Sequence, residues 1–94
     1  MTSIHFTVSG RVQGVGFRRF VFSVATQNNI IGWVKNTQDD CVEVLAKGST
    51  ESILKLINAC KKGPFFSSVS NLNFFDDSEA LFVRTPVNGF FIQR

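Results

Sequence analysis

GRVQGVGFR, residues 10–18, is the stretch that decides how this 94-residue sequence folds. Before it, Ile4, Phe6 and Val8 alternate with polar residues, which predicts a half-buried strand. After it, apolar residues recur at helical spacing and share one face: Phe17, Phe20, Val21, Val24 and Ala25. We therefore predict that residues 10–18, called the glycine loop below, lead from a strand into a helix.

The residues that follow predict a small sheet with a second helix. Strands are expected at 30–36, 42–46 and 69–75, with short β segments at 82–84 and 90–92. A helix is expected from a cap at Ser49 or Thr50 to Gly63-Pro64, with one apolar face made of Ile53, Leu56, Ile57 and Cys60. The order is βαββαβ with an extra C-terminal strand.

This order is typical of the α+β class. It predicts a ferredoxin-like split-βαβ sandwich, with two helices on one face of a mainly antiparallel sheet. We expect a single domain over residues 1–94, because either half alone would be too small to bury a useful core.

Composition and charge narrow the classes of partner. The chain is 44% hydrophobic and 18% charged, which is typical of a folded protein. No apolar run approaches the roughly 18 residues of a membrane span, and no leader peptide is evident, so we expect the chain in the cytoplasm. We also expect it to be a monomer. Residues 1–38 carry four basic residues and no acidic one. That local positive charge favours an anionic partner: a phosphate, a nucleic acid or a membrane surface.

The glycine loop has the features of a phosphate site. Backbone N–H groups and the positive end of a helix converge between a strand and a helix, and glycines let an anion approach the backbone. Arg18 and Arg19 in the first turn oppose the helix dipole, which makes sense if a multivalent anion lies between the loop and a guanidinium. The alternative is that both arginines lie in solvent and the loop is an ordinary tight turn. The nucleotide-binding spacings G-x-x-x-x-G-K-[ST] and G-x-G-x-x-G are absent, the second because Arg19 takes the place of its last glycine.

The whole chain resembles the acylphosphatase family. The glycine loop matches the family signature, and Gly32-Trp33-Val34-Lys35-Asn36 follows at the family's distance, as do Val42-Glu43-Val44, Gly48, Gly63-Pro64 and Gly89-Phe90-Phe91-Ile92. The resemblance implies that Arg18 and Asn36 are catalytic. It also implies that the phosphate is bound by the loop: Gln13, Gly14, Val15, Gly16, Phe17 and Arg18. The family has glycine where this chain has Asn29 and Asp40, two residue types that tolerate the left-handed backbone.

The resemblance implies a hydrolase that converts small acyl phosphates into a carboxylate and inorganic phosphate. A carboxylate leaves readily, so the reaction needs charge neutralisation and a placed water rather than a general acid. We therefore expect no metal, no cofactor, and neither nucleic acid nor membrane as a partner. Two rivals remain open: an RNA-binding module of similar strand order, and a phosphate-binding domain that does not turn over.

Five features outside the loop carry simpler expectations. Trp33 is expected in the core, and His5, the only histidine, on an exposed strand position without a partner. Cys41 on a strand and Cys60 on a helix face are expected to be buried free thiols. Phe65-Phe66, beside Gly63-Pro64, are core by default, although an apolar patch for a partner stays open.

Overall fold

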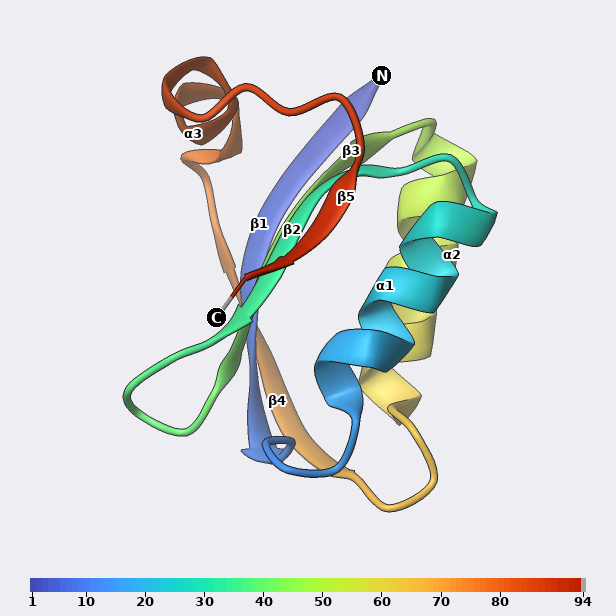
Figure 1. The fold of residues 1–94 in the computed structure, drawn as a ribbon, viewed down its shortest axis with the longest axis vertical. Coiled ribbons are helices and arrows are strands. Elements are labelled where there is room, and N and C mark those ends of the chain that lie inside the picture. The colour runs from blue at the N-terminus through green and yellow to red at the C-terminus, as the bar shows by residue number, and fades with distance from the viewer. Residues whose placement is uncertain (94) are drawn as a thin grey trace.

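A five-stranded sheet with helices on both faces forms the body of the protein (Figure 1). The computed structural model describes residues 1–93. Its elements follow in the order β1 (Thr2–Arg11), α1 (Phe17–Gln27), β2 (Ile31–Asn36), β3 (Val42–Gly48), α2 (Thr50–Lys62), β4 (Ser68–Phe75), α3 (Ser78–Arg84) and β5 (Phe90–Gln93). In space the strand order is β4-β1-β3-β2-β5. All neighbours are antiparallel except β2 and β5, which confirms the mainly antiparallel ferredoxin-like sheet.

The main core lies between the sheet and the helices α1 and α2, which cover the same face in Figure 1. Strand residues of period two supply one side and helix residues of period 3.6 supply the other, as the sequence predicted. The largest fully buried side chains of this core come from both layers: Phe6, Val8, Val34, Val42 and Val44 from the strands, and Phe17, Val21, Ile53, Leu56 and Cys60 from the helices.

A third helix on the opposite face corrects the prediction of a β segment at 82–84. These residues belong to α3, whose Phe82 is 8% exposed and packs on Trp33 and Leu45. A short apolar run gives no reliable period, so strand and helix cannot be separated from it. The helical form is the one seen where residues 82–84 pack against the outer face of the sheet. The same packing buries Trp33, which confirms its predicted core position.

His5 is buried, which makes the expectation of an exposed histidine wrong. Its Nδ1 lies 2.6 Å from Asp77 Oδ1, and its Nε2 lies 2.6 Å from Glu43 Oε2. The ring also packs against Trp33 and Phe75. The two partners come from elements that lie next to β1 only in the folded chain. Glu43 belongs to the neighbouring strand β3, and Asp77 is the N-cap residue of α3, a helix that the sequence did not reveal.

Two turns confirm the predicted use of residues that tolerate a left-handed backbone. Asn29, after α1, has φ 56°, and Asp40, in the β2–β3 turn, has φ 68°. The cap of α2 is Ser49, whose hydroxyl accepts from the Ser52 amide at 3.1 Å. Asn29 and Asp40 lie in the connections before and after β2, the strand that ends at Asn36.

The two cysteines differ in environment. Cys60 is buried in the core, as expected, and burial raises the pKa of its thiol to about 12. Cys41 lies in the turn before β3 rather than on a strand, and it is only partly buried. Both are free thiols.

Candidate active site

The glycine loop joins the end of β1 to the start of α1. Gly14 and Gly16 have φ values of 74° and 81°, in the left-handed region that other residues rarely adopt. A Cβ on either glycine would meet nothing within 4 Å, so glycine is needed there for the backbone turn and not for lack of space. Both glycines, and the first residues of α1, line the pocket described next.

Within residues 1–93, no side chain caps the N-terminus of α1. Gly16 is its N-cap residue, no side chain accepts a hydrogen bond from the cap, and the first turn holds no acidic residue. The first N–H groups of a helix require an acceptor from outside the helix, and their partial positive charge favours an anion. The start of α1 is therefore suited to hold a ligand with several oxygens.

A small pocket lies at this helix start. Its volume is about 220 Å³, below the roughly 300–1,000 Å³ of sites for drug-sized ligands. Its lining comes from the glycine loop, α1, β2 and β5: Val12, Gly14, Gly16, Phe17, Arg18, Arg19, Asn36 and Ile92. Five of the predicted site residues thus meet around one cavity: Gly14, Gly16, Phe17, Arg18 and Asn36. Gln13 and Val15 do not line it.

Arg18 and Asn36 reach the pocket from different elements. Arg18 lies in the first turn of α1, and Asn36 is the last residue of β2, opposite Val42 on β3. The Arg18 guanidinium donates to the Gln93 carbonyl of β5 at 3.3 Å. Within residues 1–93 no carboxylate forms a salt bridge with Arg18 or Arg19. The positive charge at the pocket is therefore not neutralised by the described part of the chain.

Ile92 and Gln93 are site residues that sequence reasoning missed. Ile92 lines the pocket, and the Gln93 carbonyl accepts from Arg18. Both are brought there because β5 pairs in parallel with β2, with Val34 opposite Ile92 and Lys35 opposite Gln93. Parallel neighbours bring residues from distant parts of the chain to one edge, and no local spacing signals that pairing. The resemblance had marked residues 89–92 only as a landmark of the fold.

The Gln13 side chain connects the glycine loop to the β2–β3 turn. Its Nε2 donates to the Thr37 carbonyl at 3.0 Å and to the Cys41 carbonyl at 2.8 Å. Thr37 directly follows Asn36, so these two hydrogen bonds join the loop to the residue next to Asn36. The Gln13 NH₂ group is thus used by the two carbonyls, and Gln13 does not line the pocket.

The remaining chemistry near the pocket is sparse. Cys41 is no activated nucleophile, because desolvation first, and then the charge of Asp39, raise the pKa of its thiol. Among residues 1–93 no group of three or more His, Cys, Asp and Glu side chains is arranged to hold a metal ion. None of the helices described is long and apolar enough to cross a bilayer. The polar side chains that line the pocket are those of two arginines, Arg18 and Arg19, and one carboxamide, Asn36, beside the backbone of Gly14 and Gly16.

Fold and site together define a small α+β protein with a candidate anion site at a strand-to-helix loop. Comparison with known proteins adds the family. The acylphosphatase family model matches residues 4–90. An acylphosphatase of Bacillus velezensis is 46% identical over 72 residues, which cover 77% of this chain and 80% of that one. The crystal structure of the Bacillus subtilis acylphosphatase covers 100% of both chains at 36% identity, with a TM-score of 0.87.

The same fold occurs inside a longer protein. The crystal structure of T. kodakarensis HypF contains a region that covers all of this chain at 28% identity with a TM-score of 0.78, and that region is 12% of the HypF chain. The family model and the full-length likenesses decide the assignment. The chain belongs to the acylphosphatase family of enzymes.

Proposed function

We propose that this chain hydrolyses the carboxyl-phosphate bond of small acyl phosphates, releasing a carboxylate and inorganic phosphate without a metal or a cofactor. One observation carries the proposal: Arg18, Asn36 and the uncapped start of α1 line the same pocket. The first two supply the polar side chains of the reaction, and the helix start supplies backbone donors. Membership of the acylphosphatase family supports the reaction type.

Arg18 and the loop amides are proposed to hold the phosphoryl group. A planar guanidinium can donate to two oxygens at once, and the amides from Gly14 to Arg18 can donate to the others. These donors neutralise the negative charge on the phosphoryl oxygens, which would otherwise repel the nucleophile that attacks phosphorus. The Gln93 carbonyl, 3.3 Å from Arg18 Nη1, holds the guanidinium at the pocket before the substrate arrives.

Asn36 is proposed to place the attacking water. Its carboxamide oxygen accepts a hydrogen bond from water, and its NH₂ group can donate to a phosphoryl oxygen. A new bond forms between the water oxygen and phosphorus as the bond from phosphorus to the carboxyl oxygen breaks. Asn36 is too weak a base to take the water's proton, so that proton passes to a phosphoryl oxygen of the substrate.

The leaving group explains why so few residues are needed. A carboxylate departs without protonation, because its conjugate acid has a pKa of about 4. Phosphate monoesters should resist this pocket, since an alkoxide would need a general acid that the pocket lining does not offer.

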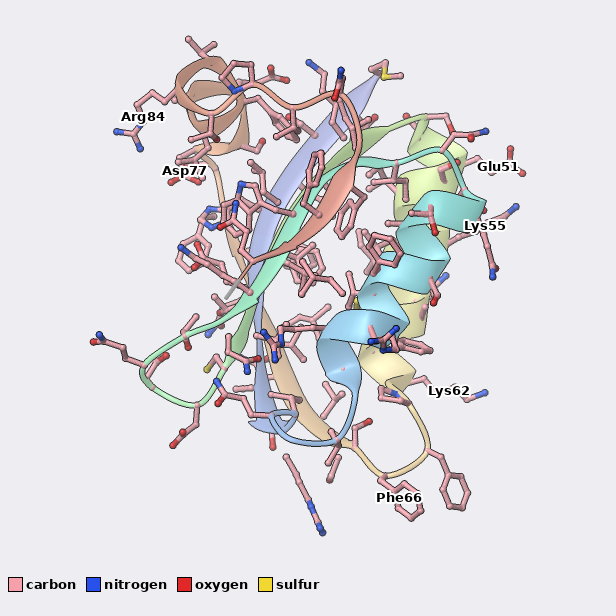
Figure 2. The ribbon with its side chains drawn as sticks, viewed as in Figure 1. Glu51, Lys55, Lys62, Phe66, Asp77 and Arg84 are labelled. Carbon is pink, nitrogen blue, oxygen red and sulfur yellow. The ribbon has the colours of Figure 1, made fainter. Side chains whose placement is uncertain are left out.

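The test is phosphate release from acetyl phosphate and benzoyl phosphate in the presence of EDTA. Arg18→Ala should lose binding and rate together, whereas Asn36→Ala should keep the KM nearly unchanged and lose about 10²–10³ in kcat. Arg84→Ala is the matched control, because Arg84 is an exposed arginine on α3, at the other end of the molecule (Figure 2). Parental kcat in Asn36→Ala would refute the assignment of the water site.

A second candidate is a phosphate-binding domain without turnover, suggested by the likeness to part of a longer protein. A folded sample that binds phosphate at Arg18 but releases none from any acyl phosphate would favour it. We further propose that the chain acts as a monomer in the cytoplasm. Gel filtration should give a mass near the 10.5 kDa of one chain.

A further inference from the structure

Two phenylalanines project from the end of the molecule that carries the glycine loop. Phe65 is 91% exposed and Phe66 is 72% exposed, and their rings meet edge to face with centroids 4.9 Å apart. They lie in the turn at residues 64–67 between α2 and β4, called the aromatic turn below. Figure 2 shows Phe66 pointing away from the body. The default expectation that these rings belong to the core is therefore wrong, and the open alternative of a surface patch needs an explanation.

The aromatic turn is held in place rather than slack. The Ser67 amide and hydroxyl both donate to the Pro64 carbonyl, at 3.0 Å and 2.6 Å. Gly63 before it has φ 74°, and a Cβ there would lie 2.2 Å from Ser67 Oγ and 3.0 Å from a ring carbon of Phe17. The turn is thus closed by its own hydrogen bonds and fitted against the core, and it presents both rings to the outside.

Unpaired basic residues surround the aromatic turn. Lys61 and Lys62 are exposed on the last turn of α2, and Arg11 is exposed at the end of β1, opposite Ser68 in the sheet register. Within residues 1–93 none of the three forms a salt bridge. The sequence has no acidic residue from 52 to 75. The acidic β2–β3 turn projects on the far side of the glycine loop from the aromatic turn (Figure 1).

We propose that the aromatic turn docks this protein on anionic lipid bilayers. The two rings would enter the boundary between headgroups and acyl chains, and Lys61, Lys62 and Arg11 would lie at the level of the lipid phosphates. Aromatic side chains favour that boundary, and basic residues near it are attracted by the negative surface. The contact is made by a protruding tip, which suits a deformable bilayer, whereas a folded partner would need a matching cavity.

This proposal is independent of the catalytic one, and it changes one expectation from the sequence. The sequence indicated no membrane partner, and a surface contact needs no membrane-spanning helix. The contact is expected to be weak and reversible. A single myristoyl chain gives an association constant of about 10⁴ M⁻¹, and two rings bury less apolar surface than that chain, so millimolar lipid is required.

Vesicle flotation tests the proposal with the intact chain. Wild type is mixed with millimolar lipid as phosphatidylcholine vesicles, with and without about one third phosphatidylglycerol, at low and at physiological salt. We expect binding to the anionic vesicles at low salt, weaker binding at physiological salt, and at least tenfold weaker binding to neutral vesicles. Phe65→Ala/Phe66→Ala should reduce binding to anionic vesicles at least tenfold.

Matched variants separate the aromatic turn from general stickiness. Val83→Ala removes a side chain that is 80% exposed on α3, and it should bind like wild type. Lys61→Gln/Lys62→Gln should weaken binding several-fold, whereas Lys55→Gln, higher on the same helix in Figure 2, should change it less than twofold. Phosphate release in solution should stay unchanged in all of these variants, which shows that they are folded.

Three results would overturn the proposal. Wild type could remain unbound at millimolar anionic lipid, or Phe65→Ala/Phe66→Ala could bind as tightly as wild type. In the third, wild type does not bind vesicles but self-associates in sedimentation velocity, and Phe65→Ala/Phe66→Ala does not self-associate. That result would assign the aromatic turn to a second copy of the chain.

Discussion

Replacing Gln13 distinguishes two roles that this residue could have in the site. The resemblance to the family places Gln13 among the phosphate-binding residues. In the structure its side chain instead donates to the carbonyls of Thr37 and Cys41, at 3.0 Å and 2.8 Å. If the structural role holds, Gln13 sets the position of Asn36 relative to the glycine loop. A loss of that link should then act on the rate more than on substrate affinity.

The size of the stability effect can be worked out from the two hydrogen bonds. Each is worth about 0.5–1.5 kcal/mol. The Cys41 carbonyl keeps the Thr37 amide as a donor at 2.9 Å, so the loss in Gln13→Ala falls mainly on the Thr37 carbonyl. We expect about 1–2 kcal/mol of destabilisation, which lowers the Tm by roughly 5–15 °C for a domain of this size.

The kinetic effect should separate the two roles. Because a small displacement of a positioned group can cost about a hundredfold in rate, Gln13→Ala should lose about 10–100-fold in kcat with less than a threefold change in KM. Gln13→Glu should be worse than Gln13→Ala in both stability and rate, since a carboxylate cannot donate and would face two carbonyl oxygens. Gln27→Ala, an exposed glutamine at the end of α1, is the matched control.

The assays are phosphate release from benzoyl phosphate and thermal unfolding followed by circular dichroism. A rise in KM with parental kcat in Gln13→Ala would mean that the side chain binds the phosphate directly. Activity and Tm of Gln13→Glu equal to wild type would show that the two hydrogen bonds have no role.

Three further predictions concern the rest of the chain. His5→Ala should lower the free energy of unfolding in urea by about 1–3 kcal/mol, because two carboxylates lose their shared partner, and a loss below about 0.3 kcal/mol would contradict this. Asn29→Gly/Asp40→Gly should raise the Tm by a few degrees, because glycine relieves about 0.5–1 kcal/mol of backbone strain at the two left-handed positions in total. A lower Tm would show that the two positions are not strained. Because burial raises the pKa of Cys60 to about 12, Ellman's reagent at pH 8 should titrate only Cys41 in the folded protein and both thiols in urea, and rapid reaction of both in the folded state would contradict the buried position.

Local sequence patterns were sufficient for most of the fold. The alternation in β1, the helical spacing from Phe17, and the breakers at Gly63-Pro64 each act over a few residues, so they can be read without the tertiary structure. The left-handed turns at Asn29 and Asp40 were predicted for the same reason. The one wrong element was α3, because its apolar run is short and its identity depends on packing against Trp33.

The candidate site was predicted as far as it depends on the glycine loop and on Asn36. Those residues belong to two continuous motifs, and the fold brings both to one pocket. Ile92 and Gln93 could not be predicted, because they arrive through the parallel pairing of β5 with β2. The two hydrogen bonds of Gln13 also depend on a turn that the loop meets only in three dimensions. Residues that act through long-range contacts are the ones that spacing does not reveal.

The site of attack is the point on which the proposed chemistry depends. Hydrolysis of acetyl phosphate in water labelled with ¹⁸O, with the products analysed by mass spectrometry, reports it directly. If Asn36 aims water at phosphorus while Arg18 holds the phosphoryl oxygens, the label should appear in inorganic phosphate and be absent from acetate. Label in acetate would mean attack at the carbonyl carbon, and it would contradict the roles proposed for both residues.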